Sequence, residues 1–213
     1  MTVDDSVPPA TTPRQEEILD HALALVREGG LSNLTTRRLA ERVGFSEPAL
    51  YRHFGGKQAV LLGLTYRLEA MLLGTVEDIS SDVRQPALQR LRRILLFHVR
   101  LNQVNNSLPI LLLAEASSSG DPKLMERMRT ILARYLTYLE RLVREAQEAG
   151  DVPAEPYTDC LALLALGLPA AFAIRHRLLP DKAFEARVLN NLIPFFVDGM
   201  LIERGTRRDK GEE

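Results

Sequence analysis

The chain has 213 residues, enough for one or two domains with a buried core, and its 46% apolar and 26% charged residues exclude a disordered or fibrous protein. Its 27 basic and 28 acidic side chains nearly cancel, so no overall positive field directs it to nucleic acid. The single cysteine, Cys160, excludes an internal disulfide and a cysteine-based zinc site, and its apolar neighbours predict a buried thiol.

The two ends of the chain are polar. Residues 1–12 contain acidic residues and prolines but no basic segment followed by an apolar run, so they predict a disordered lead-in rather than a secretory signal. The charged tail, 205–213, is also expected to be disordered. The longest uncharged apolar stretch, 160–174, is shorter than the roughly 20 residues that a bilayer requires. We therefore expect a cytoplasmic protein with no membrane contact.

Helices dominate the predicted structure, because apolar residues recur at spacings of three and four. Thr35, Ser46 and Asp121 are expected N-caps, and Pro13 and Pro122 are expected first-turn prolines. In chain order the expected helices cover about 13–29, 36–43, 47–54, 57–79, 86–104, a shorter helix opened by Pro109, 122–149, 156–179 and 181–204. The sequence thus predicts an all-α fold: a three-helix domain over 13–58 and a larger helical bundle over 59–204.

The second and third helices, joined by a tight break at Gly44-Phe45, match a helix-turn-helix whose second helix enters the major groove. Between Leu31 and Arg67, six cations stand against two anions, a local basic face suited to phosphates. The segment TTRRLAERVGFSEPALYRHFGGK, residues 35–57, resembles the signature of the TetR family of transcriptional regulators. The resemblance covers about 14–66, and its most specific part is Leu-Tyr-x-His-Phe at 50–54 with Lys57 after it.

By position in the motif, the resemblance implies that five side chains approach the DNA backbone: Thr36, Arg37, Tyr51, His53 and Lys57. Leu50 and Phe54, four residues apart, are expected to face inward against the first helix. The base edges are left to Glu47, Pro48, Ala49 and Arg52. Arg52 is equally suited to a phosphate, and Glu47 would be repelled by phosphates unless it finds a donor. An ordinary solvated helix face is the competing interpretation of these residues.

In the family that the chain resembles, the C-terminal domain often encloses a small-molecule pocket. His98 and Asn102 share one helix face with Leu88, Leu91 and Leu95, so both are expected to point inward. They are candidates for the pocket wall, and the residues that we expect to join them are Glu115, Tyr135 and Tyr138. A satisfied core histidine is the competing interpretation. Abundant leucine and few aromatic residues favour an apolar ligand.

The TetR resemblance also implies that the last two helices form a homodimer. These helices are the most apolar in the chain, and pairing them across a two-fold axis would remove their surface from water. The expected interface residues are Leu163, Leu166, Ala170, Phe172, Leu189, Leu192, Phe196 and Met200. Packing inside one subunit is the competing interpretation. Arg175 and His176 are expected to complement the C-terminus of a helix.

These features predict a sequence-specific DNA-binding regulator, acting as a repressor that binds an inverted-repeat operator as a homodimer and is released by a small apolar effector. The alternative is a TetR-like DNA binder that senses no metabolite and recruits a protein partner, as nucleoid-occlusion members of this superfamily do. The sequence has no Gly-rich phosphate loop, metal-ligand spacing or nucleophile motif. We therefore expect no enzymatic activity, cofactor or metal.

Overall fold

The computed structural model describes residues 11–155 and 157–201, and within these ranges it is helical with no strand, which confirms the predicted all-α fold. Of the segments expected to be disordered, 1–12 and 205–213, residues 1–10 and 205–213 lie outside the described residues, whereas Thr12 is ordered as the N-cap of α1, so the prediction is wrong there. The elements are α1 (Pro13–Gly29), η1 (Leu31–Asn33), α2 (Thr36–Val43), α3 (Glu47–Tyr51), α4 (Lys57–Ser80), α5 (Ala87–Val104), α6 (Leu108–Ser119), α7 (Pro122–Glu148), α8 (Thr158–Leu178), α9 (Lys182–Arg187), η2 (Val188–Leu192) and α10 (Ile193–Asp198).

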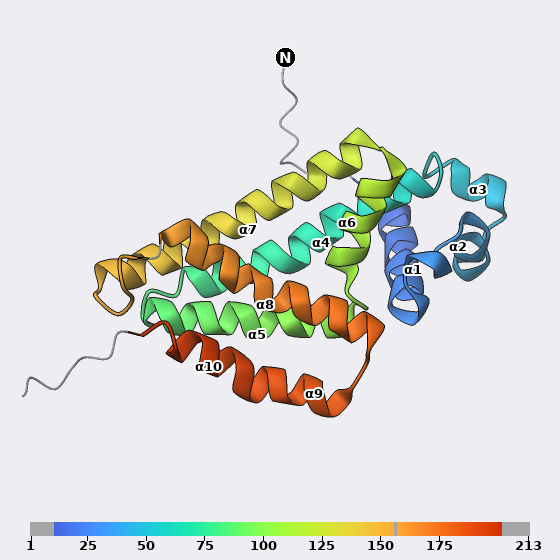
Figure 1. Ribbon diagram of the computed structural model, residues 1–213. Helices are drawn as coiled ribbons and strands as arrows, with labels where there is room; N and C mark the ends of the chain where they lie inside the picture. The colour runs from blue at the N-terminus through green and yellow to red at the C-terminus, as the bar shows by residue number, and fades with distance from the viewer. Residues whose placement is uncertain (1–10, 156, 202–213) are drawn as a thin grey trace, which may run out of the picture.

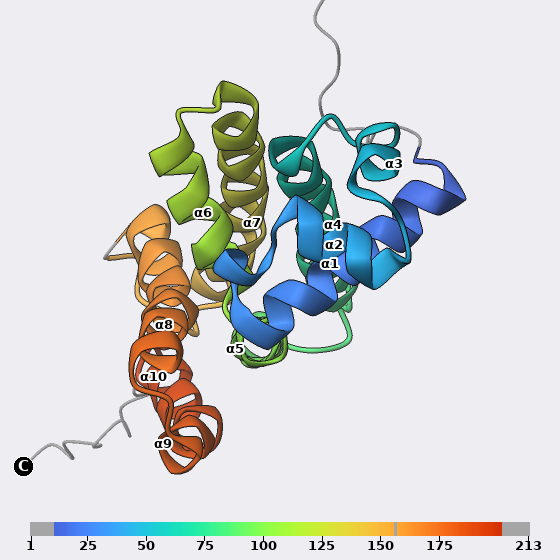
Figure 2. The ribbon, with the colours of Figure 1, turned by 90° about the vertical axis from the view of Figure 1, so that its right-hand side faces the viewer.

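A head made of α1, α2 and α3 lies at one end of an elongated bundle formed by α4 to α10 (Figure 1). Helix α4 begins beside α3 and runs into the bundle, where α5, α6 and α7 pack against it. Figure 2, which looks at the molecule from the head end, shows α8, α9 and α10 gathered on one side of the bundle. Helix α4 therefore connects the head directly to the centre of the bundle.

Local side-chain chemistry sets several of the helix starts. The Thr35 hydroxyl accepts a hydrogen bond from the backbone N–H of Arg38, and the Asp121 carboxylate accepts from the N–H groups of Lys123 and Leu124. Both predicted caps are confirmed. Ser46 occupies the N-cap position of α3, but its side chain makes no capping bond, so that part of the prediction is wrong.

Gly44 sets the angle between α2 and α3. Its backbone lies in the left-handed region, with φ of 80° and ψ of 30°, and its N–H donates to the last carbonyls of α2. A residue with a Cβ is strained in this conformation, whereas glycine adopts it freely. The chain can therefore turn within three residues, 44–46, and place α3 against α2.

The last helix is less regular than the sequence predicts. Instead of one helix over 181–204, the described residues form α9, a π-helical turn and α10 in direct succession, while 202–204 lie outside the described residues. Pro194 in the first turn of α10 has no N–H to donate to the preceding turn, which favours the wider π turn before it. If α9, the π-helical turn and α10 are counted as one helix and the short η1 is left out, the described part of the chain contains about nine helices, as expected.

Two helices, α4 and α8, are long and apolar enough to cross a membrane by length and composition alone. In α4 the apolar residues face neighbouring helices, and half of its most apolar window is buried within the chain. This is the pattern of a core helix. Only 33% of the corresponding window of α8 is buried, so α8 presents apolar surface on the outside of the bundle.

Candidate nucleic-acid interface, cavity and dimer face

The head has its own apolar core beneath α2 and α3. Leu39, Leu50 and Phe54 are buried there, which places Leu50 and Phe54 inward as expected. The Gln15 side-chain amide on α1 donates a 2.9 Å hydrogen bond to the backbone carbonyl of His53. Helix α1 thereby fixes the turn that follows α3, and the opposite face of α3 is left to solvent.

The outer face of α2 and α3 carries most of the residues expected to contact DNA. Arg37, Pro48, Tyr51 and Arg52 are exposed, and half of the Tyr51 surface is open to solvent. The other five residues of this set are half-buried: Thr36, Glu47, Ala49, His53 and Lys57. Thr36 and Arg37 begin α2, the residues from Glu47 to Tyr51 form α3 and Lys57 begins α4 beside α3 (Figure 1), so the expected residues lie on neighbouring elements of the head and its junction with the bundle.

Glu47 has a partner inside the head. The Thr36 hydroxyl donates a 2.5 Å hydrogen bond to Glu47 Oε1, which joins the first turn of α2 to the first turn of α3. The carboxylate therefore has a donor before any DNA is present. This contact supplies a structural role for Glu47 that the sequence alone did not reveal.

His53 packs against an aromatic ring rather than standing free. Its imidazole stacks on Phe45, with the ring centroids 5.7 Å apart, and the Arg14 guanidinium lies 4.1 Å from the Phe45 ring centroid. Arg14 comes from the first turn of α1, outside the helix-turn-helix motif. The fold thus adds a cation beside the expected interface that the motif did not indicate.

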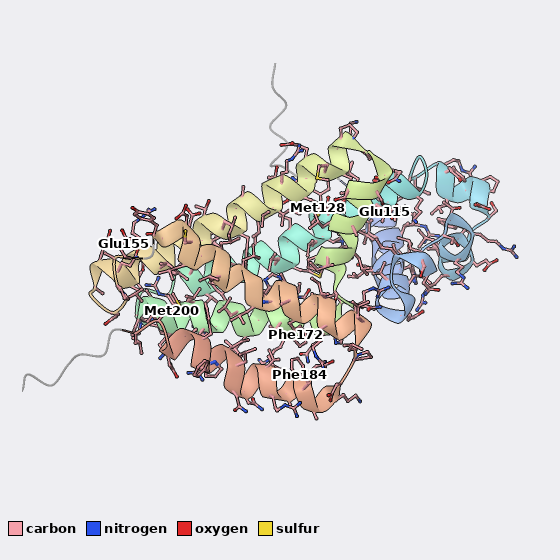
Figure 3. The ribbon with its side chains drawn as sticks, in the orientation of Figure 1. Glu115, Met128, Glu155, Phe172, Phe184 and Met200 are labelled. Carbon is pink, nitrogen blue, oxygen red and sulfur yellow. The ribbon has the colours of Figure 1, made fainter. Side chains whose placement is uncertain are left out.

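Lys57 opens α4 at the junction between the head and the bundle. Its Nζ atom lies 4.0 Å from Glu115 Oε1 on α6. Figure 3 places Glu115 at this junction, near the start of α4. A residue expected at a ligand pocket is therefore found beside a residue expected to contact phosphate.

A cavity of about 190 Å³ lies inside the bundle, between α4, α5, α6, α7 and α8. Figure 3 shows Met128, one of its lining residues, on α7. Three polar side chains contribute to the wall: His98, Asn102 and Tyr135. The remaining lining residues are apolar: Leu68, Leu72, Pro109, Ile110, Leu113, Met128, Ile131, Leu132, Leu166, Ala170 and Ala173.

His98 and Tyr135 form a buried pair. His98 Nδ1 lies 3.0 Å from the Tyr135 hydroxyl, and the two rings meet edge to face. Burial lowers the pKa of His98 to about 4 and raises the pKa of Tyr135, because the interior disfavours either charge. Both side chains are therefore neutral at pH 7. The predicted inward orientation of His98 and Asn102 is confirmed.

Two residues expected at the pocket are not in its lining. Tyr138 lies on α7 beside Arg141, whose guanidinium carbon is 5.5 Å from the Tyr138 ring centroid. Glu115 contacts Lys57 as described above. Glu115 lies on another face of α6 from Ile110 and Leu113. Tyr138 lies one turn beyond Tyr135 along α7, past the part of that helix that lines the cavity, and the sequence could not establish either position without knowing how the helices pack.

The eight residues expected at a dimer interface divide by burial. Phe172 and Met200 are buried within one chain, and Leu166 and Ala170 line the cavity. Phe172 and Met200 are corrections to the prediction, because they pack inside the subunit, whereas Leu166 and Ala170 are half-buried and stay predictions. Figure 3 shows Phe172 and Met200 on α8 and at the end of α10. Of the remaining four, Leu189 and Phe196 are half-buried, whereas Leu163 and Leu192 are exposed.

Other apolar residues, which the sequence analysis missed, occupy the outer faces of α8 and α10. Leu164, Ile174 and Leu178 follow one stripe of α8, and Phe195 on α10 is 75% exposed. Leu164 and Phe195 line the same groove, so the two stripes meet. Both faces of an apolar helix look alike in sequence, and therefore only the packing distinguishes them.

Cys160 differs from expectation, since it is exposed on the outside of α8 rather than buried, because the apolar residues after it belong partly to the outer stripe. His176 lies in the last turn of α8, as expected, and it also contacts Glu185 at 2.7 Å and stacks on Phe172, so it links α8 to α9. Arg175 does donate to the carbonyl of Leu179, as expected.

Comparison with known proteins gives matches to regulators. The family described as "Bacterial regulatory proteins, tetR family" matches residues 18–64. The nucleoid occlusion factor SlmA of Vibrio campbellii is 34% identical over 148 residues, covering 68% of this chain and 74% of its own. SlmA of Sodalis glossinidius is 30% identical over 181 residues, covering 82% and 90%.

Solved structures share the fold over nearly the whole chain. The fatty acid degradation regulator FadR of Bacillus halodurans matches with a TM-score of 0.74 and 18% identity, covering 90% of this chain and 98% of its own. The ketosteroid transcriptional regulator KstR2 of Mycobacterium tuberculosis matches with a TM-score of 0.71 and 18% identity, covering 91% and 98%. The helix-turn-helix head and the bundle therefore occur together in known regulators.

Proposed function

Since this chain belongs to the TetR family of DNA-binding transcriptional regulators, we propose that it acts as a homodimeric repressor that a small apolar ligand releases from an inverted-repeat operator. The observation that carries the proposal is the position of α4. This helix begins at the candidate DNA face with Lys57 and passes the cavity with Leu68 and Leu72. A ligand in the cavity would therefore contact the helix that holds the head.

For the DNA contacts, we assign Arg37, Tyr51, His53 and Lys57 to phosphates, with Pro48, Ala49 and Arg52 nearest the bases; Thr36 is not among them, because its hydroxyl donates its one proton to Glu47. The exposure of Pro48, Tyr51 and Arg52 supports this assignment. We assign Glu47 mainly to the contact with Thr36, which holds α2 and α3 in register.

For the dimer, we propose a two-fold contact through the outer faces of α8 and α10, centred on Leu164 and Phe195. These side chains are exposed in a single chain, and a contiguous apolar surface of this kind is typical of an interface. A dimer presents two heads, which matches an inverted repeat. The regulator would act in the cytoplasm, where the DNA lies, with no catalytic activity or cofactor of its own.

For the coupling between cavity and DNA, we propose a route through α6. Ile110 and Leu113 of α6 line the cavity, and Glu115 on the same helix lies beside Lys57. A ligand that displaces α6 would change how closely this carboxylate approaches the lysine. Glu115 would thus compete with DNA phosphates for Lys57.

The second candidate function is recruitment of a protein partner without a ligand. It is favoured by the SlmA relatives, which are named as nucleoid occlusion factors and are 30–34% identical to this chain. In that case the chain would bind DNA through the same head, and the cavity would be a packing defect.

Replacing Lys57 with alanine tests the DNA interface. We expect weaker binding to every duplex sequence, because a phosphate contact carries no sequence information. Each phosphate contact contributes about 0.9 to the slope of log K against log salt, and a dimer has two copies of Lys57. The slope measured by fluorescence anisotropy over a salt series should therefore fall by about 2.

Lys182→Ala is the matched control, since Lys182 is exposed on α9 away from the head. It should leave both affinity and slope unchanged. By contrast, substitutions at Pro48 or Ala49 should change which sequence is preferred. An unchanged salt slope in Lys57→Ala would show that Lys57 does not contact DNA.

Thermal melts of the full chain with a panel of small apolar compounds distinguish a sensor from a protein-recruiting DNA binder. A ligand at a hundredfold excess over its Kd raises the free energy of unfolding by about 2.7 kcal/mol. We expect at least one compound to raise the melting temperature and to lower the affinity for DNA. If no compound did both, the recruitment function would be favoured.

A further inference from the structure

The C-terminal end of α1 lies against the turn between α5 and α6, residues 105–107 (Figure 1). The Asn106 side-chain amide donates a 3.1 Å hydrogen bond to the backbone carbonyl of Val26, in the last turn of α1. Beside it, the Arg27 guanidinium donates at 3.0 Å to Asn105 Oδ1. The α5–α6 turn therefore holds the head by its first helix, in addition to the connection that α4 provides.

The same turn is attached to α8. Asn106 Oδ1 accepts a 3.0 Å hydrogen bond from the Arg177 guanidinium in the last turn of α8, and the Ser107 hydroxyl donates to the carbonyl of Ala173 at 3.0 Å. The Arg177 guanidinium also lies over Gly30, the C-cap of α1, where a Cβ would be only 2.7 Å from an arginine nitrogen. Asn106 thus joins the head to α8, with one end of its amide on each.

The backbone of the turn has a conformation that side chains rarely allow. Asn106 and Ser107 have φ of 50° and 58°, and within the described ranges they are the two non-glycine residues with positive φ. Asparagine tolerates this left-handed region better than most residues, but such a conformation persists only where the surroundings fix it. Here Asn105 and Ser107 are buried, and the Ser107 N–H donates to the Asn102 carbonyl at 2.8 Å. This backbone gives Asn106 the position from which its amide reaches both α1 and α8.

The first part of α4 is bound tightly to the head. Arg67 on α4 pairs with Glu16 and Asp20 on α1, at 2.6 Å and 2.8 Å. These pairs join α1 and the first part of α4 into one unit. A rotation of this unit against the rest of the bundle, about the long axis of α4, keeps the pairs but separates the end of α1 from the α5–α6 turn. The contacts of Asn106 therefore oppose this rotation.

The orientation of the head matters because a dimer binds two half-sites at once. Two heads held in fixed orientations fit a repeat whose half-sites have the matching separation. One added base pair moves a half-site by about 3.4 Å along the duplex and by about a tenth of a turn around it. A head that rotates freely about α4 follows such a change, whereas a head that is held to α8 does not.

From these observations we propose that Asn106 is a specificity-determining residue that acts without contacting DNA. By joining α1 to α8 it fixes the orientation of each head, and it thereby selects the spacing between the two half-sites of the operator. The proposal rests on the proposed function, in which two chains paired through α8 and α10 bind an inverted repeat. The carbonyl of Val26 is the head end of the contact, and Arg177 is its α8 end.

Asn106→Gly tests the proposal, because glycine adopts φ of 50° freely, so the turn is kept while the amide is lost. Duplexes that the unmodified chain selects from a random library supply the half-site. Inverted repeats of this half-site are then made with spacers one or two base pairs shorter or longer, and binding is measured by fluorescence anisotropy. We expect the unmodified chain to prefer one spacing. In Asn106→Gly this preference should fall by about tenfold, with unchanged affinity for a single half-site.

Further variants separate the two ends of the contact. Asn106→Asp still accepts from Arg177 but cannot donate to the Val26 carbonyl, so it should lose the preference as glycine does. Arg177 is exposed, so Arg177→Ala keeps the fold and should also lose the preference, whereas Arg177→Lys keeps a donor and should retain part of it. Gln89→Ala is the matched control: it removes an exposed amide near the opposite end of α5 and should leave the preference unchanged.

The outcomes separate this proposal from the proposed function. An unchanged spacing preference in Asn106→Gly would overturn the proposal and leave binding to the repeat standing; if that variant did not fold, Arg177→Ala would decide in the same way. An equal loss of affinity for the repeat and for the single half-site would also overturn it, because Asn106 would then maintain the fold of the head rather than its orientation. If the unmodified chain bound the repeat no better than a single half-site, the proposed function would fail as well.

Discussion

Replacing Leu164 and Phe195 together with glutamate should convert the protein from a dimer to a monomer. Both side chains are exposed in a single chain, so the glutamates stay hydrated in the monomer and its fold is retained. In the dimer each glutamate would be buried against apolar groups of the partner. An apolar anchor at an interface contributes about 2 kcal/mol or more to the free energy of association, and each residue occurs twice in a two-fold dimer.

Light scattering measures the change from dimer to monomer directly. The unmodified chain should have twice the mass of one 23.9 kDa chain, and the double variant the mass of one. Its affinity for an inverted repeat should fall by about a hundredfold or more, because each head then binds a half-site independently. Val83→Glu is the control, since Val83 is 81% exposed in the connection between α4 and α5. A dimeric double variant would place the interface elsewhere.

Removal of the Glu69 carboxylate should destabilise the bundle strongly. Glu69 on α4 is buried and contacts Arg127 and Arg134, both on α7, and the Arg127 guanidinium lies 4.0 Å from the Tyr66 ring centroid. Breaking a buried ion pair by removing one partner costs about 3–5 kcal/mol. We therefore expect Glu69→Ala to lower the free energy of unfolding by about 3 kcal/mol.

Urea denaturation at a fixed protein concentration measures this loss, because the stability of a dimer depends on concentration. Glu77→Ala is the matched control: it removes an exposed carboxylate from the same helix and should change the free energy little. Glu69→Gln keeps the shape of the side chain, and its loss in free energy of unfolding should lie between those of Glu69→Ala and Glu77→Ala. A loss below about 1 kcal/mol in Glu69→Ala would mean that the cluster behaves like a surface pair.

The cluster of Glu69, Arg127 and Arg134 is expected to affect regulation as well as stability. It joins α4, which carries the head, to α7, which lines the cavity with Met128, Ile131 and Tyr135. A pair of arginines on one carboxylate fixes how α4 lies along α7. We expect variants at Glu69 to alter the dependence of DNA binding on ligand, in addition to lowering stability.

The sequence by itself determined the helical fold and the composition of the head. Helix starts at Pro13, Thr35 and Asp121 depend on caps and prolines within a few residues, which is why a local pattern predicts them. Leu50 and Phe54 were placed inward because their spacing matches one face of a helix. The inward position of His98 and Asn102 follows from the same spacing.

The tertiary structure decided which apolar faces are buried and which side chains meet. Sequence periodicity did not distinguish Phe172, which is in the core, from Ile174 two residues later, which is exposed. The contact between Thr36 and Glu47, the position of Glu115 beside Lys57 and the unpartnered oxygen of Asn102 likewise appear only in the folded chain. The physical reason is common to all of them: capping and helical spacing act between near neighbours, whereas burial and partnering depend on helices that approach from distant parts of the sequence.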